Sequence, residues 1–172
     1  MITLLESKAD QFAEEKHRGV FRTTGEPYIT HPRAVRDLLK IELDIHDDDT
    51  LSATMLHDTI EDCKGVTRQI LEQEFNWNIA RIVATLSRNY PIQLSRQDYN
   101  ERILASDTPV QIIKLADIIH NLSTTVIIPE KKKWIQRKIE EYQTFYVPLA
   151  QRTAPRFYDL LTSSMQKVSE QL

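Results

Sequence analysis

The chain has 172 residues, a length that suits one folded domain, and we expect residues 1–172 to form a single domain. Hydrophobic residues make up 41% and charged residues 27%, which excludes a disordered or fibrous protein. A net charge of −3 gives no overall attraction to nucleic acid, so an anionic ligand would have to be held by a local group of cations.

The sequence carries no mark of export or of membrane insertion. Cys63 is the only cysteine, so it cannot form an internal disulfide, and the first residues lack a basic start followed by an apolar stretch. No apolar run approaches the roughly 18 residues that cross a bilayer. We therefore expect a cytoplasmic protein that binds neither nucleic acid nor a membrane.

Helices are favoured throughout, because the chain has only three glycines and seven prolines. Residues 18–29 carry Gly25 and Pro27 without a helical period and are expected to form a loop. We predict an all-α bundle of about nine helices. In chain order, the expected helices are 4–17, 30–40, 50–62, 67–75, 77–86, one beginning after Ser95, 109–125, 129–145 with a bend or interruption at Pro148, and one beginning at Pro155.

Capping patterns set several of these helix starts. Thr3 followed by Glu6 reads as a capping box, and a second box follows Ser95. Asp47 begins an acidic stretch that suits the start of the helix 50–62. Asp107 is predicted to cap the helix that starts at proline two residues later.

The sequence LHDTIED, residues 56–62, gathers acids around a histidine. His57 and Glu61 are four residues apart, as are Asp58 and Asp62, so all four would lie on neighbouring stripes of one helix. The three carboxylates would repel one another unless solvent or a cation neutralises them. From this segment alone, an exposed acidic helix end explains the pattern as well as a metal site does.

Two further segments favour the metal site. Asp117 lies among apolar residues of the expected helix 109–125 and needs a compensating partner, which a metal ion would supply. His31 precedes Pro32 at a helix start, where a helix-capping histidine is the simpler interpretation. The remaining histidines are taken as structural or surface residues, and the run 131–133 as a solvated helix face: His17, His46, His120 and Lys131–Lys133.

Taken in order, His31, the pair His57–Asp58 and Asp117 resemble the H…HD…D metal signature of HD-domain phosphohydrolases. Three blocks more closely resemble the hydrolase domain of the Rel/SpoT alarmone enzymes and the small, Mesh1-like alarmone hydrolases. These blocks are GEPYITHP (25–32), MLHDTIED (55–62) and IKLADIIHNL (113–122), and YVPLAQR (146–152) is similar to the end of that domain.

The resemblance implies a single HD-type domain that holds one divalent ion, usually manganese. It makes His31, His57, Asp58 and Asp117 the metal ligands. The implied substrate is guanosine tetra- or pentaphosphate, (p)ppGpp, which loses its 3′-pyrophosphate. These donor types would also accept iron, cobalt or zinc, and a homo-oligomer stays open.

The resemblance also assigns roles around the ion. Glu61 and Asp62 match the catalytic acids of the family, with Glu61 as the first choice of base. The residues that match substrate contacts, for phosphates or for the base, are Arg22, Asn121, Thr124, Lys138 and Tyr142.

Three positions depart from the family pattern, because Thr23, Ile118 and Ser123 stand where basic residues are common. The loss of charge should weaken binding of a highly phosphorylated nucleotide. An adenosine analogue such as (p)ppApp and the 2′-phosphate of NADPH are therefore kept as alternative substrates. A nucleotide-binding module without turnover is a further alternative, which the intact Glu61 and Asp62 disfavour, and a plain helical interaction domain is the least favoured.

Overall fold

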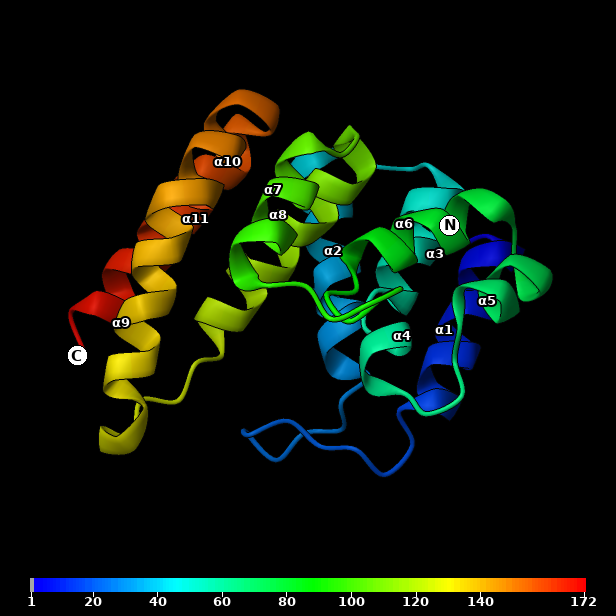
Figure 1. Cartoon of the computed structure of the whole chain (residues 1–172), viewed down its shortest axis with the longest axis horizontal. Coiled ribbons are helices and arrows are strands. Elements are labelled where there is room, and N and C mark those ends of the chain that lie inside the picture. Colours follow the sequence, from blue (N-terminus) through cyan, green and yellow to red (C-terminus); the bar gives the residue numbers. More distant parts are fainter. Residues whose placement is uncertain (1) are drawn as a thin grey trace.

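A computed structural model describes residues 2–172 (Figure 1). Over this range the backbone forms α-helices and no strand, with an isolated antiparallel bridge between Phe21 and Pro27. The helices are α1 (Leu4–Lys16), α2 (Thr30–Leu43), α3 (Asp48–Leu56), α4 (Thr59–Asp62), α5 (Arg68–Glu74), α6 (Trp77–Leu86), α7 (Arg96–Ala105), α8 (Thr108–Ser123), α9 (Lys132–Glu141), α10 (Val147–Thr153) and α11 (Pro155–Ser169).

The predicted all-α class is confirmed. Within the described range, the expected number of about nine helices is also confirmed when α3 with α4 and α9 with α10 are each counted as one interrupted helix. No helix between residues 2 and 172 combines the length and the apolar character that a membrane crossing requires.

Most of the predicted helix caps form. Thr3 Oγ1 accepts a hydrogen bond from the backbone N–H of Glu6 (3.2 Å), and Asp47 Oδ2 accepts one from the N–H of the third residue after it (2.8 Å). Ser95 Oγ accepts the corresponding bond at the start of α7 (3.1 Å). Asp107 takes the predicted N-cap position of α8, but its carboxylate forms an ion pair with Arg81 (2.6 Å) and makes no side-chain cap bond.

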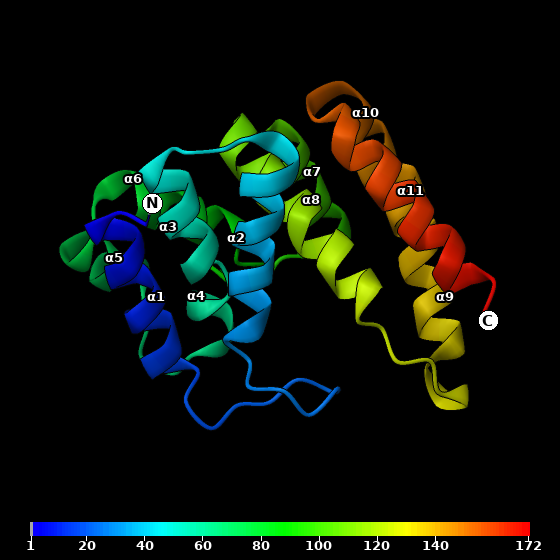
Figure 2. The ribbon, with the colours of Figure 1, turned by 180° about the vertical axis from the view of Figure 1, so that it is seen from behind.

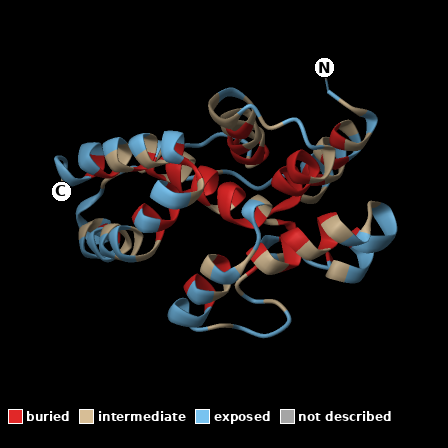
Figure 3. Cartoon of the chain, turned by 90° about the horizontal axis from the view of Figure 1, so that it is seen from above, coloured by how far each residue is buried: buried red, intermediate tan, exposed pale blue. Residues whose placement is uncertain are grey.

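Helix α8 lies at the centre of the fold and packs against α2, α6, α10 and α11. In Figures 1 and 2, α1, α3, α5 and α6 lie on one side of the α2–α8 pair, and α9, α10 and α11 lie on the other. Buried residues gather on the inward faces of the helices (Figure 3). Most of α8 is buried because apolar side chains occur all around it, which is typical of a core helix.

The helix predicted over residues 50–62 is interrupted in its second half. α3 ends at Leu56 and α4 begins at Thr59, so the residues between them stand at a junction rather than on one regular helix. Side chains satisfy carbonyl groups at this point: Thr59 Oγ1 donates to the carbonyl of Leu56 (2.7 Å). His57 Nδ1 likewise bonds the carbonyl of Thr54 (2.7 Å). The interruption therefore leaves these backbone acceptors bonded.

The helix predicted over residues 129–145 is also divided. It begins with a 3-10 turn, η1 (Pro129–Lys131), and ends in a π-helical turn, η2 (Tyr142–Tyr146). Within η2 the N–H of Val147 reaches the carbonyl of Tyr142, one residue further back than in an α-helix. The next residue is Pro148, which has no N–H to give to a carbonyl. The expected interruption at Pro148 is thus confirmed, and it lies just before the proline.

Candidate metal centre

Four side chains from three parts of the chain meet at one point. His31 lies in the first turn of α2, Asp117 lies on α8, and the pair His57–Asp58 forms the α3–α4 junction. The Nε2 atoms of His31 and His57 are 3.2 Å apart. Asp58 Oδ2 lies 3.5 Å from the first of these nitrogens and 3.1 Å from the second. Asp117 Oδ1 lies 3.2 Å and 3.9 Å from the same two nitrogens.

These distances fit ligands that share one ion. Metal bonds of about 2.0–2.2 Å place neighbouring ligand atoms about 3–3.5 Å apart. The separations above fit this range except the 3.9 Å between Asp117 Oδ1 and His57 Nε2, and the donor atoms of His31, His57 and Asp58 all lie within 4.8 Å of one another. His31, His57 and Asp117 are only 1%, 4% and 6% exposed, respectively. Burying carboxylates is costly unless a cation compensates them, and two imidazoles with two carboxylates suit a borderline divalent ion.

The hydrogen bonds of both imidazoles agree with this role. His57 Nδ1 lies 2.7 Å from the carbonyl of Thr54, an acceptor, so Nδ1 carries a proton and Nε2 is the nitrogen that would give its lone pair to a metal ion. His31 Nδ1 lies 2.8 Å from Nδ1 of His120. Metal-binding histidines commonly bond a second group through the nitrogen that does not bind the metal.

The charges of the cluster favour a cation. Burial acts to lower the pKa of His57, but the carboxylates of Asp58 and Asp117 outweigh burial and raise this pKa to about 9 in the metal-free protein. Burial acts to raise the pKa of Asp58, and the neighbouring His57 holds it below its usual range. The metal-free cluster therefore keeps ionised acids beside a protonated imidazole. A metal ion would displace that proton.

Asp117 has two direct partners besides the two histidines of the cluster. Lys114 Nζ pairs with its Oδ2 at 2.8 Å, and Asn121 Nδ2 donates to its Oδ1 at 2.5 Å. Burial acts to raise the pKa of Asp117, and the charge of Lys114 is the main cause that holds it well below its usual range. The buried acid is thus compensated from both ends, and its Oδ1 still faces the two imidazoles.

Glu61 and Asp62 stand next to this cluster and are both exposed. Glu61 Oε2 accepts a hydrogen bond from the backbone N–H of Arg88 (2.9 Å). The Tyr28 hydroxyl donates to Asp58 Oδ2 (2.6 Å) and lies 3.2 Å from Asp62 Oδ2. The two predicted catalytic acids also line the same cavity as His57, Asp58 and Asp117.

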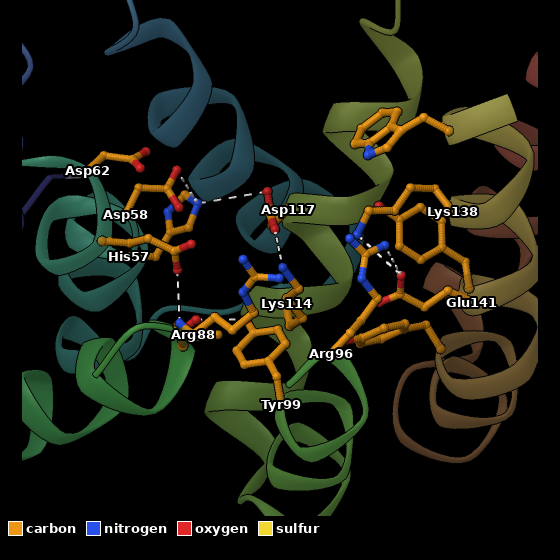
Figure 4. A pocket seen from close by; sticks show the side chains of 15 residues that line it. His57, Asp58, Asp62, Arg88, Arg96, Tyr99, Lys114, Asp117, Lys138 and Glu141 are labelled. Carbon is orange, nitrogen blue, oxygen red and sulfur yellow. Dashed lines mark hydrogen bonds and ion pairs between the residues drawn. The ribbon is translucent and has the colours of Figure 1, made fainter. Parts of the chain in front are cut away.

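The cavity has a volume of about 300 Å³, and both acidic and basic side chains line it. In Figure 4 the acidic cluster lies on one side, Lys114 lies near the centre, and Arg96 and Lys138 lie on the other side. Arg96 Nη1 and Lys138 Nζ share Glu141 Oε2, at 2.9 Å and 3.3 Å. Of the predicted substrate contacts, Lys138 and Tyr142 are part of the lining.

The other predicted substrate contacts form a separate group beside the cluster. Arg22 Nη2 donates to Asn121 Oδ1 (3.1 Å) and to Thr124 Oγ1 (2.9 Å). These three residues do not line the main cavity, but Asn121 links Arg22 to Asp117. The predicted contacts thus approach the candidate metal centre from two directions.

The three departures from the family pattern have different surroundings. Ile118 is 1% exposed and packs in the core, so it contributes no group to the cavity. Thr23 and Ser123 are exposed and lie outside the cavity lining.

Sequence analysis missed several residues of the site. Lys114 stands three residues before Asp117, a helical spacing that could have identified it as the partner of the buried acid. Tyr28 lies within the quoted block GEPYITHP, but the sequence alone gave it no role. His120, predicted to be a structural or surface residue, has its ring against the ring of His31.

An all-helical fold that gathers two histidines and two aspartates at a helix junction defines a class of metal-dependent proteins. Residues 9–154 match the HD domain family. The chain belongs to this family, and HD domains are metal-dependent.

Two named proteins are similar to this chain over most of its length. A probable GTP pyrophosphokinase of Mycobacterium leprae is 35% identical over 152 residues, which cover 84% of this chain and 19% of that protein. The guanosine-3′,5′-bis(diphosphate) 3′-pyrophosphohydrolase of Vibrio cholerae is 37% identical over 150 residues, 81% of this chain and 20% of that protein. The chain therefore spans about a fifth of the length of these relatives.

A solved structure shares the fold. The structure of a metazoan orthologue of SpoT, described as hydrolysing ppGpp, superposes with a TM-score of 0.79 and covers 96% of both chains. The two sequences are 22% identical, so this likeness concerns the fold alone.

The carboxyl group of Asp62 provides a test of the electrostatics of the metal-free site. Partial desolvation of the Asp62 carboxyl at the edge of the cavity, followed by the charge of Asp58, raises the pKa of Asp62 from 3.8 to about 6. The folded state therefore holds a proton that the unfolded state loses near pH 3.8, and the resulting stability is lost as the pH rises through about 6. In chelator-treated protein, the free energy of unfolding relative to Asp62→Asn should fall over this range in urea titrations. A difference that is independent of pH would show that the site leaves the pKa of Asp62 unchanged, and a difference that rises with pH would show that the site lowers this pKa.

Proposed function

We propose that this protein is a metal-dependent pyrophosphohydrolase that removes the 3′-pyrophosphate from guanosine tetra- or pentaphosphate. One observation carries the proposal: His57, Asp58 and Asp117, which meet His31, line one cavity together with Glu61, Asp62 and several basic side chains. The name of the Vibrio cholerae relative supports the same reaction. We further propose that residues 1–172 form one hydrolase domain. A cytoplasmic location and assembly into a homo-oligomer stay predictions from the sequence.

The proposed ligands are His31, His57, Asp58 and Asp117, and the proposed ion is manganese. The bond from His57 Nδ1 to a backbone carbonyl and the two bonds to Asp117 support these assignments, because they orient donor atoms toward one point. When bound, a divalent ion supplies a Lewis acid for a phosphate oxygen and lowers the pKa of a coordinated water.

Glu61 is the proposed general base. The backbone N–H of Arg88 holds its Oε2, so the carboxylate has a fixed orientation at the edge of the cavity. Water attacks the phosphorus attached to the 3′ oxygen, its proton passes to Glu61, and the bond from phosphorus to the 3′ oxygen breaks. Asp62 is the proposed acid, which returns a proton to the 3′ oxygen of the departing nucleotide. The products are pyrophosphate and a nucleotide with a free 3′ hydroxyl.

Two groups of residues would hold the substrate. Arg22, beside Asn121 and Thr124, would bind phosphate with its planar guanidinium. On the other side, Lys138 Nζ lies 5.6 Å from the ring centre of Tyr142, a pairing that suits a phosphate beside a stacked base. Arg96 and Lys114 also line this cavity, so together with a bound divalent ion they would give phosphate groups local positive partners among its acids.

The proposed division of roles predicts different losses in two variants. Asp58→Ala should lose both metal and activity, because it removes a ligand. Glu61→Ala should keep the metal and lower kcat by about 10²- to 10⁴-fold, the range typical of general-base removal. Metal content by mass spectrometry and single-turnover hydrolysis would measure both effects. Glu140→Ala, on the exposed side of α9, is the matched control and should retain both properties. Equal metal loss in the Asp58 and Glu61 variants would refute the division.

A manganese-dependent hydrolysis screen tests the proposed reaction itself. The substrates are (p)ppGpp, (p)ppApp, NADPH and simple nucleotides, and the products are separated by ion-exchange chromatography. We expect release of pyrophosphate from the 3′ position, with guanosine substrates turned over fastest. Release of only a 2′- or 5′-phosphate would overturn the pyrophosphohydrolase assignment. Binding of nucleotide without turnover would favour the non-catalytic module.

A further inference from the structure

The ring of His120 lies against His31, on the side away from the metal cluster. The two Nδ1 atoms are 2.8 Å apart, and the ring centres are 4.9 Å apart at an interplanar angle of 41°. The opposite nitrogen of His31, Nε2, is the one that faces His57 and the two aspartates. His31 therefore lies between the candidate metal centre and His120.

This arrangement fixes which nitrogen of each ring can carry a proton. If His31 binds a metal ion through Nε2, its proton must be on Nδ1. A hydrogen bond needs one donor and one acceptor, so Nδ1 of His120 must then accept, with its own proton on Nε2. His120 would thus select the tautomer of His31 that presents a lone pair to the metal.

The second histidine ligand is supported in a different way. His57 Nδ1 bonds the carbonyl of Thr54, an acceptor that the backbone of α3 provides. His31 stands in the first turn of α2, and its acceptor is a side chain of another helix, α8. The support for His31 can therefore be removed by a single side-chain substitution.

The last turn of α8 holds His120 in place. Its backbone carbonyl accepts hydrogen bonds from Ser123 Oγ (2.8 Å) and Thr124 Oγ1 (2.9 Å). Three residues earlier, the same helix provides Asp117. α8 thus contributes one ligand directly and contacts another through His120.

We propose that His120 is a positioning residue of the metal centre, which accepts a hydrogen bond from His31 and so aims the Nε2 lone pair of His31 at the ion. The inference rests on the proposed function, because it requires His31 to be a metal ligand.

The test measures manganese affinity in the full-length, chelator-treated protein by isothermal titration calorimetry. His120→Leu introduces an apolar side chain of similar size that has no hydrogen-bond acceptor. It should weaken manganese binding by about 10- to 100-fold, the usual effect of losing the hydrogen-bond partner of a metal ligand. His120→Asn places an amide oxygen near the position of Nδ1 and should restore binding to within a few-fold of the wild type. His46→Leu, which removes an exposed histidine that bonds Asp44, should bind like the wild type.

Stability measurements separate positioning from a merely structural role. Without metal, His31 can place its proton on either nitrogen, so the leucine and asparagine variants should unfold at similar temperatures. With manganese, the leucine variant should gain less thermal stability than the asparagine variant. If His120→Leu does not fold, His120→Ala tests the same loss.

The outcomes distinguish this inference from the proposed function. Wild-type protein that binds manganese, with a leucine or alanine variant of equal affinity, would overturn the role of His120 and leave the metal site intact. Equal weakening in the leucine and asparagine variants would also overturn it, because the acceptor would then not matter. Wild-type protein that does not bind manganese would overturn the proposed function, and this inference with it.

Discussion

The site depends on the convergence of two carboxylates and two imidazoles at the point where α2, the α3–α4 junction and α8 meet. Such a cluster is costly unless a cation lies among its acids. In the metal-free protein a protonated His57 is this cation, because Asp58 and Asp117 raise the pKa of His57 to about 9 despite its burial. A divalent ion would replace this proton with a larger charge and would join all four donor atoms.

Helix α8 connects this cluster to the rest of the molecule. It packs at the centre of the bundle, and its buried apolar faces fix its position against α2 and α11. From this fixed helix Lys114 and Asn121 bond the two oxygens of Asp117. Asn121 also accepts a bond from Arg22, so the loop of residues 18–29 is attached to the same helix. Ligand orientation and proposed phosphate binding thus share one rigid element, as a precise site requires.

Local patterns in the sequence predicted the helical class and most helix starts, because caps and apolar periodicity depend on residues near one another. The four candidate ligands came from the resemblance to the HD family, since each local segment alone left another interpretation open. The sequence could not show that His120 contacts His31, 89 residues earlier, or that Arg22 contacts Asn121, 99 residues later. Such contacts depend on how the helices pack. The break between α3 and α4 also departs from the predicted continuous helix 50–62, and there the side chains of Thr59 and His57 bond the carbonyls of Leu56 and Thr54.

The central claim is that one divalent ion binds among four named side chains. Anomalous diffraction from crystals of the full-length protein grown with manganese tests it most directly. The account predicts one strong anomalous peak within bonding distance of Nε2 of His31 and His57, Asp58 Oδ2 and Asp117 Oδ1. A structure with manganese in the crystal and no peak at that point, or with Lys114 alone neutralising an uncoordinated Asp117, would contradict it.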